Sequence, residues 1–488
     1  MDIKPLYLGG SLETVERKIA EETVTEISEA GLLRLLGEGK ELQKEMCDLP
    51  LEERLEVVGM LGEVWRERLV AGELAETRKR LATSTGYPEK LMHLEFSLVP
   101  RVLNADEIRR NLESSLIGGA AGLESFVELE KGEAVRHLPV GPTFIISSGN
   151  SIVPTLIPTI VSLVTGNFTL LKPSLANYEA VAEVFAGLGE LMSKSPAAHL
   201  MARSLAIGYF GHDSPGLKKA LTDSPFGVIN FWGGEPARTS VAAMVAENPA
   251  HPRFFVNGPL TGVAMIHEAR ADESAAHGLA LNMVLYEQQL CSSPTMAVFV
   301  GPKHRALQFA EMVSKHLDSI GSQFPLDPPT EALFVLNSAR KVLQFKGSKV
   351  LQSQDNRNPW TLAVSKERSL LDEAVRSFPS FGVHGRRRFV EMVVVDDVEK
   401  AAALVRSVGS MLSYKGVDKV QTVGLALPEG QREELLWSLA SSGVYRLVPL
   451  EDMFMRSAAE PYDGVALASL FTFAVYERER IMPTEGLF

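Results

Sequence analysis

From residue 143 onwards the sequence alternates short apolar segments with segments of helical character. The apolar segments are TFIIS at Thr143 to Ser147, FTLLK at Phe168 to Lys172 and VINFW at Val228 to Trp232. Helices are expected between them, from about Val153 to Val164 and from about Asn177 to Met192. Strands separated by helices pair in parallel through right-handed crossovers. The pattern therefore predicts an α/β fold built on doubly wound parallel sheets.

The alternation resumes beyond Asn257-Gly258-Pro259. GVAMI at Gly262 to Ile266 and TMAVFV at Thr295 to Val300 flank a helix expected from about Glu273 to Gln288, and EMVVV at Glu391 to Val395 follows. Because 488 residues exceed one typical domain, we expect two large lobes, each with its own sheet.

Two segments alternate with the period of a strand outside these lobes. FVELEKGEAVRHL, centred on Lys131-Gly132, predicts a β-hairpin, and SLFTFAVYER at Ser469 to Arg478 predicts an edge strand that could pair with it. A hairpin that leaves the main fold often serves assembly, so we expect a homo-oligomer.

Composition narrows the class of protein. With Cys47 and Cys291 as the only cysteines, a disulfide framework is excluded and a reducing compartment is favoured. The start of the chain lacks the apolar core of a secretory signal, so a cytoplasmic location is expected. A net charge of -12 argues against nucleic acid as a partner. The apolar run from Ile152 to Thr165 is too short to span a bilayer.

Residues at the ends of two predicted strands suit a phosphate-bearing ligand. Lys172-Pro173-Ser174 supplies a cation and a hydroxyl, and Gly233-Gly234 precedes a helix whose amides a diphosphate could approach. The usual GxGxxG fingerprint is missing from this region. A further basic cluster, HGRRR at His384 to Arg388, is expected to be a solvated surface or a phosphate contact. No metal site is predicted.

Three segments resemble the aldehyde dehydrogenase superfamily, and the resemblance extends over about residues 50 to 488. VSLVTGNFTLLKPS at Val161 to Ser174 is similar to that family's helix, glycine turn and cofactor strand. PVGPTFIISSGNSIVP at Pro139 to Pro154 is similar to its strand leading to an active-site asparagine, and NFWGGEP at Asn230 to Pro236 to its turn beneath the nicotinamide. Together with the cysteine segment, their order is more specific than any one motif.

The cysteine segment points to one branch of the superfamily. Glu287-Gln288-Gln289-Leu290 stands where aldehyde oxidisers have a glycine-containing sequence, and CSSP at Cys291 to Pro294 looks like the fatty acyl-CoA reductases of the bacterial-luminescence (LuxC) type. Four other segments are similar to that branch: Trp232-Gly233-Gly234, VQTVG at Val420 to Gly424, GVYRLVP at Gly443 to Pro449 and YDG at Tyr462 to Gly464.

The resemblance implies catalytic roles for two residues. Cys291 would attack an acyl carbonyl to form an acyl-enzyme, and Asn150 would stabilise the oxyanion together with the backbone amide of Cys291. Glu287 is left open between a general base and a surface carboxylate at a helix end.

The resemblance also implies cofactor contacts. Lys172 and Ser174 would hold the adenosine ribose or a 2'-phosphate, and Trp232, Gly233 and Gly234 would form the nicotinamide turn. Leu175 stands where NAD-preferring relatives have an acid, so NADPH is expected. Arg238 is a further candidate for the phosphate. The family's second glutamate, which holds the nicotinamide ribose, has no match in FGVHGRRR at Phe381 to Arg388.

One missing carboxylate favours reduction over oxidation. Aldehyde oxidisers activate water with a glutamate that should fall near Val256 or Asn257, but RFFVNGPL at Arg253 to Leu260 contains no acid. Without that base a thioester survives longer, and hydride can compete with water.

These observations predict NADPH-dependent reduction of a long-chain acyl-CoA or acyl thioester to the aldehyde through acyl-Cys291. A partner enzyme that donates the acyl group is left open. The alternatives are a CoA-acylating aldehyde dehydrogenase acting on short aldehydes, a non-redox cysteine acyltransferase or hydrolase, and an inactive scaffold.

The predicted division of the chain follows the fold of the superfamily. Its parts are a helical N-terminal part of the cofactor lobe (1–122), an oligomerisation hairpin (123–138), the NADP(H)-binding lobe (139–256), the catalytic lobe with the cysteine (257–450) and a C-terminal return with the edge strand (451–488).

Overall fold

The computed structural model describes residues 2–19 and 22–479, which form two compact units. Unit 1 contains the described residues up to Thr85, His93–Asn257 and the described residues from Ser457 onward, whereas unit 2 contains Gly86–Met92 and Gly258–Arg456. The chain therefore enters unit 2 one residue beyond the predicted division at 256/257. It returns to unit 1 six residues later than the predicted 450/451.

Unit 1 is organised by a six-stranded sheet with the order β11-β10-β7-β8-β9-β2. β2 runs antiparallel to β9, and the other neighbours pair in parallel. From β7 the chain adds β8 and β9 on one side and then β10 and β11 on the other. Doubly wound sheets bind ligands at the carboxyl ends of their strands where the order reverses, which here is between β7 and β10. The strands are β2 (Leu6–Tyr7), β7 (Thr143–Ile146), β8 (Thr169–Lys172), β9 (Leu205–Ile207), β10 (Val228–Trp232) and β11 (Arg253–Asn257).

Helices cover this sheet, and their ends follow local sequence signals. Ser28 accepts a hydrogen bond from the Gly31 amide at the start of α1, and Gly72 ends α2 with φ 79°. α6 is buried along its whole length, because its residues are apolar or small on every side. The helices are α1 (Glu29–Asp48), α2 (Leu51–Ala71), α3 (Ala75–Thr85), α4 (Glu89–Val102), α5 (Ala105–Ser115), α6 (Val153–Val164), α7 (Tyr178–Leu191), α8 (Pro196–Arg203), α9 (Pro215–Thr222), α10 (Ala237–Ala246) and α17 (Leu467–Leu470). The first four residues of α4, Glu89–Met92, belong to unit 2.

The expectation of a helical N-terminal part for residues 1–122 is wrong for the described residues before Ser28. Besides β2, this stretch forms β1 (Asp2–Ile3), β3 (Thr14–Ile19) and β4 (Glu22–Ile27), which pair in the order β1-β4-β3. TVERKI and ETVTEI each contain several β-branched residues (Thr, Val and Ile), which favour strands. Helices begin only at Glu29.

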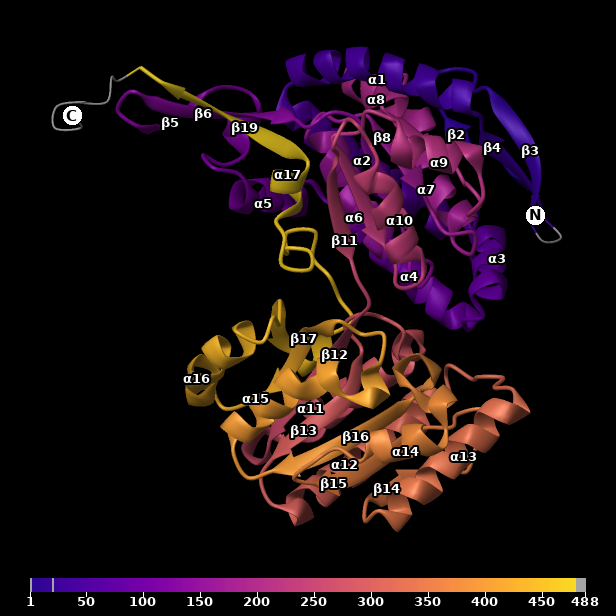
Figure 1. The fold of residues 1–488 in the computed structure, drawn as a ribbon, viewed down its shortest axis with the longest axis vertical. Helices are drawn as coiled ribbons and strands as arrows, with labels where there is room; N and C mark the ends of the chain where they lie inside the picture. Colours follow the sequence, from indigo (N-terminus) through magenta and orange to yellow (C-terminus); the bar gives the residue numbers. More distant parts are fainter. Residues whose placement is uncertain (1, 20–21, 480–488) are drawn as a thin grey trace. The chain divides into compact units, whose positions relative to one another are not determined.

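The hairpin and the C-terminal strand pair as predicted. β5 (Val127–Glu130) and β6 (Glu133–Pro139) join through Gly132, whose φ is 79°. β19 (Thr472–Arg478) lies antiparallel beside β6 (Figure 1). Arg253 fixes the start of β19 to unit 1 with a 2.8 Å hydrogen bond to the Thr472 carbonyl. That this three-stranded sheet serves oligomerisation stays a prediction.

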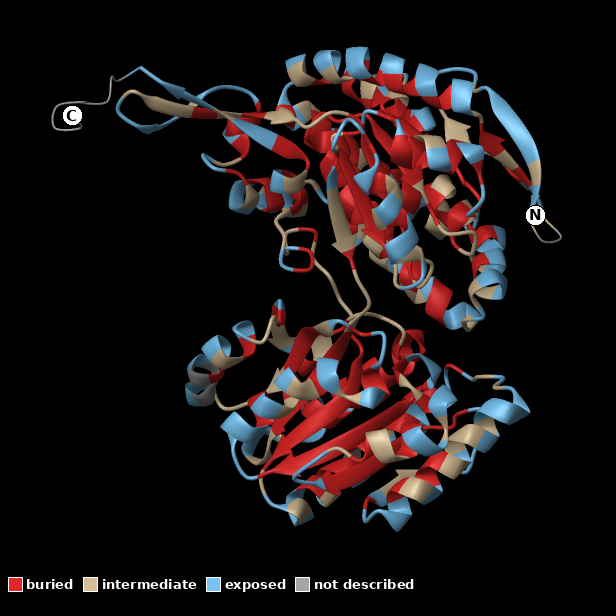
Figure 2. Ribbon diagram, viewed as in Figure 1, coloured by how far each residue is buried: buried red, intermediate tan, exposed pale blue. Residues whose placement is uncertain are grey.

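Unit 2 is a seven-stranded sheet with the order β14-β15-β16-β13-β12-β17-β18. β14 is antiparallel to β15, and the other neighbours are parallel. Its central strands are buried (Figure 2), which accords with their nearly continuous apolar sequences. The strands are β12 (Leu260–His267), β13 (Pro294–Val300), β14 (Lys349–Gln352), β15 (Thr361–Lys366), β16 (Phe389–Val395), β17 (Lys419–Ala426) and β18 (Arg446–Pro449). The helices are α11 (Glu273–Val284), α12 (Lys303–Gly321), α13 (Thr330–Phe345), α14 (Leu371–Ser377), α15 (Val398–Ser407) and α16 (Glu429–Ala440).

Within residues 2–19 and 22–479, none of the helices combines the length and the apolar character needed to cross a bilayer.

Candidate active site

The loop between β7 and α6 carries Asn150 and is fixed by two buried side chains. The Asn177 amide donates 3.1 Å hydrogen bonds to the carbonyls of Ser148 and Ser151. The Glu95 carboxylate accepts from the Ser151 hydroxyl and the Ile152 amide, each at 2.6 Å, and so caps the start of α6. Sequence reasoning assigned no role to Glu95 or Asn177.

Asn150 itself is oriented by its neighbour. Its Oδ1 accepts a 2.9 Å hydrogen bond from the Ser148 hydroxyl, so its amide nitrogen is the atom that can donate to an oxyanion. The loop also lies against Ser174, because a Cβ added to Gly149 would come within 2.6 Å of the Ser174 hydroxyl. Asn150 and Ser174, predicted independently, therefore lie in adjoining loops.

Lys172 closes β8 at the same edge of the sheet. Its ammonium lies 4.7 Å from the centre of the Tyr209 ring. Burial lowers the pKa of Lys172 to about 8, although the charge of Glu26 acts in the opposite direction. Ser174 donates a 2.8 Å hydrogen bond to Asn177. A partly desolvated cation and a hydroxyl thus lie together at one strand end.

The Trp232-Gly233-Gly234 turn closes β10 beside these loops. The Gly233 amide donates to the Asn257 carbonyl at 3.2 Å, which joins this turn to the end of β11. The Trp232 indole is 8 % exposed and packs edge-on against Tyr462, with ring centres 4.7 Å apart. Its ring is therefore part of the protein's own packing. The residues predicted on β7, β8 and β10 lie at one edge, since these strands are neighbours in the sheet.

Arg238, the further phosphate candidate, pairs within its own turn. Its Nε donates to Glu235 at 2.8 Å, and the same carboxylate accepts from Thr239. A phosphate contact would have to compete with this ion pair.

The end of β11 has a carboxylate nearby that the local sequence does not contain. Asn257 donates a 2.7 Å hydrogen bond to Asp463, which is 8 % exposed and arrives from the C-terminal return. Although the segment from Arg253 to Leu260 contains no acid, the fold therefore brings the carboxylate of Asp463 to the end of β11. Asp463 belongs to the YDG motif, which is similar to the reductase branch but to which the sequence assigned no role.

Cys291 lies in unit 2, on a half-buried loop before β13. The helix expected to reach Gln288 ends at Val284, and Tyr286, Glu287 and Gln288 follow with φ between 52° and 59°. Three successive non-glycine residues in the left-handed region cost roughly 1–3 kcal/mol each, so surrounding contacts must hold them.

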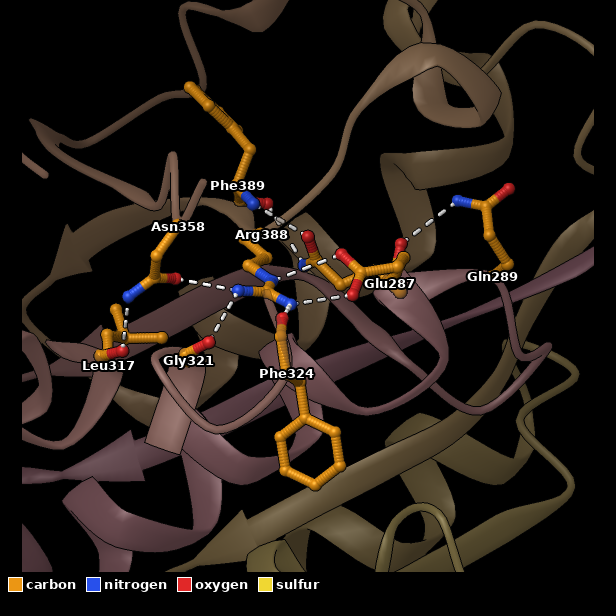
Figure 3. A network of polar contacts seen from close by, with 9 residues as sticks. Glu287, Gln289, Leu317, Gly321, Phe324, Asn358, Arg388 and Phe389 are labelled. Atoms are coloured by element: carbon orange, nitrogen blue, oxygen red, sulfur yellow. Dashed lines mark hydrogen bonds and ion pairs between the residues drawn. The ribbon is translucent and has the colours of Figure 1, made fainter. Parts of the chain in front are cut away.

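Glu287 provides the first of these contacts, and the expectation of a surface carboxylate is wrong for it. It is buried and forms a two-pronged ion pair with Arg388, with distances of 2.7 and 3.1 Å (Figure 3). Burial raises the pKa of Glu287, whereas the charge of Arg388 lowers it. A carboxylate engaged in this way is not on the surface, and a role as general base stays a prediction.

Arg388 is fully buried, so the expectation of a solvated or phosphate-binding HGRRR is wrong at this residue. Its guanidinium also donates to Asn358 at 2.7 Å and to the carbonyls of Gly321 and Phe324 (Figure 3). Arg386 is buried as well, over the ring of Tyr414. The sequence shows three adjacent arginines but not which of them the tertiary fold covers.

Gln288 ties the strained turn to two strands. Its amide nitrogen donates to the carbonyls of Pro294 and Phe389, at 2.8 and 3.1 Å, and its oxygen accepts from the Phe389 amide at 2.6 Å. The start of the cysteine loop is therefore held against the starts of β13 and β16.

Gln421 in β17 donates a 3.2 Å hydrogen bond to the Cys291 sulfur. Its oxygen accepts from the Thr422 hydroxyl at 3.1 Å, which leaves the amide nitrogen directed at the sulfur. A donor in this position stabilises a thiolate relative to a thiol. Sequence reasoning missed this role, although VQTVG was among the motifs compared with the reductase branch.

The family described as Acyl-CoA reductase (LuxC) matches residues 46–473 of this chain. The chain belongs to the LuxC family.

Two named LuxC-family relatives are distant. A long-chain acyl-protein thioester reductase of Aliivibrio fischeri is 21 % identical over 442 residues, which cover 89 % of this chain and 84 % of the relative. The protein of the same name from Vibrio harveyi is 23 % identical over 326 residues, which cover 65 % of this chain and 64 % of the relative.

Solved structures show the aldehyde dehydrogenase fold expected for a LuxC-family chain. Methylmalonate-semialdehyde dehydrogenase from Oceanimonas doudoroffii aligns with a TM-score of 0.69 at 14 % identity, over 100 % of this chain and 99 % of that one. Glyceraldehyde-3-phosphate dehydrogenase from Methanocaldococcus jannaschii, complexed with NADP, aligns with a TM-score of 0.64 at 13 % identity, over 92 % and 94 %.

Replacement of Gln421 should slow the reaction of Cys291 with electrophiles. A hydrogen bond to a charged group is worth about 1.5–3 kcal/mol, so Gln421→Leu should reduce alkylation by iodoacetamide at least about tenfold at neutral pH. Peptide mass spectrometry measures the rate. Cys47 serves as the internal control, because burial raises the pKa of its thiol and its rate should not change. An unchanged Cys291 rate would contradict the assigned role.

Glu287→Gln should destabilise unit 2, because it leaves the charge of Arg388 buried without its partner. The expected loss is about 3 kcal/mol in urea-induced unfolding, followed by fluorescence. Glu287→Gln combined with Arg388→Met should recover part of it. Lys400→Gln, which breaks an exposed ion pair with Asp396 in the same unit, is the control and should have no measurable effect. Full stability in Glu287→Gln would show that the ion pair does not hold the turn.

Proposed function

We propose that this chain reduces a long-chain acyl thioester to the aldehyde with NADPH, through an acyl group carried on Cys291. The observation that carries the proposal is the amide of Gln421 directed at the Cys291 sulfur, 3.2 Å away, in a LuxC-family chain. The names of the Aliivibrio and Vibrio relatives support an acyl thioester as the substrate class.

In the first half-reaction the Cys291 thiolate forms a bond to the acyl carbon. The donor thiol leaves as the carbon–sulfur bond to it breaks, and that thiol takes up a proton. The developing oxyanion would accept hydrogen bonds from the Asn150 amide and from the Cys291 backbone amide, two donors of the kind that stabilise tetrahedral intermediates. The strained turn fixes the sulfur for this attack.

In the second half-reaction the acyl carbon would receive a hydride, the chemistry that NADPH would supply when held by Lys172, Ser174 and the Trp232-Gly233-Gly234 turn. The carbon–sulfur bond to Cys291 then breaks, the thiolate is restored and the aldehyde leaves. Gln421 would stabilise the departing thiolate by the same hydrogen bond that activates it for attack.

The residues at the strand ends of unit 1 fit a phosphorylated dinucleotide. Lys172 offers a cation that burial has partly stripped of water, so an anionic group gains more from it than from a solvated lysine. Ser174 offers a hydroxyl nearby. The amide-bearing turn at Gly233-Gly234 lies at the reversal of strand order, where such ligands bind. We propose Lys172 and Ser174 as ribose or 2'-phosphate contacts and Trp232-Gly233-Gly234 as the nicotinamide turn.

The proposal includes a cytoplasmic homo-oligomer that receives acyl groups from acyl-CoA or from a partner enzyme. The low cysteine content supports the cytoplasmic location, and the three-stranded sheet of β5, β6 and β19 supports the homo-oligomer.

Cys291→Ala should abolish both aldehyde formation and the covalent acyl-enzyme. A long-chain acyl-CoA is incubated with and without NADPH, aldehyde is measured by gas chromatography and the acyl adduct by intact-protein mass. Cys47→Ala is the matched control and should retain both. Turnover by Cys291→Ala would refute the mechanism. Acyl transfer by the wild type without loss of NADPH would support a non-redox acyltransferase instead.

NADPH binding should weaken as the pH rises through about 8. Lys172 is protonated below its pKa of about 8 and neutral above it, so its attraction for a 2'-phosphate is lost on the alkaline side. Isothermal titration between pH 7 and 9.5 should show this rise in Kd for NADPH and a smaller one for NADH. Lys172→Gln should raise the Kd for NADPH about tenfold at pH 7 and flatten the dependence. If Lys172→Gln shows the same pH dependence of the Kd for NADPH as the wild type, Lys172 does not contact the cofactor.

A further inference from the structure

A cavity of about 310 Å³ lies within unit 2, between the start of α13 and the loop that leads into β16. All the residues of its lining belong to unit 2, so unit 1 contributes nothing to it. Its volume is at the lower end of the range for small-molecule sites, about 300–1,000 Å³. The apolar residues of its wall include Leu326, Pro329, Leu333, Leu336, Pro359 and Phe381.

The charged residues of the lining favour an anion. Two guanidinium groups, those of Arg386 and Arg387, line the cavity together with one carboxylate, that of the exposed Glu331. Arg387 is half-buried, and its Nη1 donates to the carbonyls of His384 and Arg386 at 2.7 and 2.9 Å. None of the ion pairs among the described residues includes Arg387. Burial lowers the pKa of Arg387, so its charge is partly removed from water and would be stabilised by an anion.

Arg386 adds a second positive charge to the same wall. Its three guanidinium nitrogens are buried and have no hydrogen-bond partner in the part of the chain that the structure describes. The group lies over the Tyr414 ring, 4.8 Å from its centre. The buried Glu391 is close enough for its charge to interact with Arg386, but this carboxylate is already held by a hydrogen bond from the Leu370 amide. Because a buried charge without hydrogen bonds is unfavourable, Arg386 also favours an anion at this wall.

The apolar wall and the two arginines together define the class of ligand. An alkyl chain gains free energy from every methylene that it buries, and a guanidinium binds a carboxylate through two parallel hydrogen bonds. The cavity is too small for a folded partner, whose interface would bury about 800 Å² on each side. We propose that this cavity binds the anion of a fatty acid, with its alkyl chain along the apolar wall and its carboxylate on Arg387.

The cavity is distinct from the cysteine site, because neither Cys291 nor Gln421 belongs to its lining. It does border the segments that hold the Glu287–Arg388 ion pair. Arg387 directly precedes Arg388 in the sequence, and Leu326 lies two positions after Phe324, whose carbonyl accepts from Arg388. A fatty acid would therefore bind to unit 2 outside the reaction, against the segments that support the turn before Cys291.

Isothermal titration of the full chain with decanoate, without NADPH, should show one saturable site. Octanoate should bind about fourfold more weakly for each methylene that is no longer buried. Decan-1-ol lacks the charge and should bind at least about tenfold more weakly than decanoate. Arg387→Gln should weaken the binding of decanoate about tenfold and leave that of decan-1-ol unchanged, because only the carboxylate contacts this side chain.

Ala332→Trp provides a second variant that does not alter the charges. Ala332 lines the cavity from an exposed position on α13, so a large side chain there should fill the cavity and abolish binding while the midpoint of urea unfolding stays unchanged. Lys341→Gln is the matched control, since it removes an exposed positive charge from the same helix outside the lining. Its Kd for decanoate should equal that of the wild type.

Cys291→Ala should also bind decanoate as the wild type does. Loss of binding in this variant would place the ligand at the cysteine site and overturn the inference. The inference is equally overturned by the absence of saturable binding, by binding that survives both Arg387→Gln and Ala332→Trp, or by an equal loss in Lys341→Gln. No turnover is measured, so the result does not depend on whether the protein reduces acyl thioesters.

Discussion

The buried ion pair between Glu287 and Arg388 is the interaction on which the cysteine loop depends. A guanidinium taken fully out of water is tolerated only when its donors are satisfied, and here Glu287, Asn358 and two backbone carbonyls accept from it. In return the pair holds a turn with three left-handed residues. The same few contacts compensate both the strain of that turn and the cost of burying the charge, so the turn before Cys291 depends on this ion pair.

The sheets of both units were predictable because their strands are short, apolar and separated by helices of amphipathic or buried character. Periodicity located β7, β8, β10, β13 and β16 to within a few residues, and the alternation in Ser469 to Arg478 correctly suggested the pairing with the hairpin. β3 and β4 lie in the part of the chain expected to be helical, although their segments are rich in β-branched residues. That error came from applying the pattern of residues 28–115 to the segment before it.

The candidate site was predictable only where its residues lie in one continuous motif. Lys172 ends a strand, and Ser174 and Gly233 follow one, so the rule for parallel sheets brought them to one edge. Gln421 and Asp463 reach their partners across 130 and 206 positions of sequence. Glu287 lies in a continuous motif, but the local sequence does not reveal that Arg388 pairs with it and that both are buried. Contacts of this range depend on tertiary packing, and no local period encodes them.

The return of the chain to unit 1 at Ser457 has a consequence for synthesis on the ribosome. Unit 2 contains the uninterrupted stretch Gly258–Arg456, whereas unit 1 needs residues from before and after that stretch, including β19 and Asp463. Domains usually fold in the order in which they emerge. Here unit 1 begins to be synthesised before unit 2 but is completed after it. The contact of Asp463 with Asn257 at the end of β11 can form only once the residues beyond Arg456 have been synthesised.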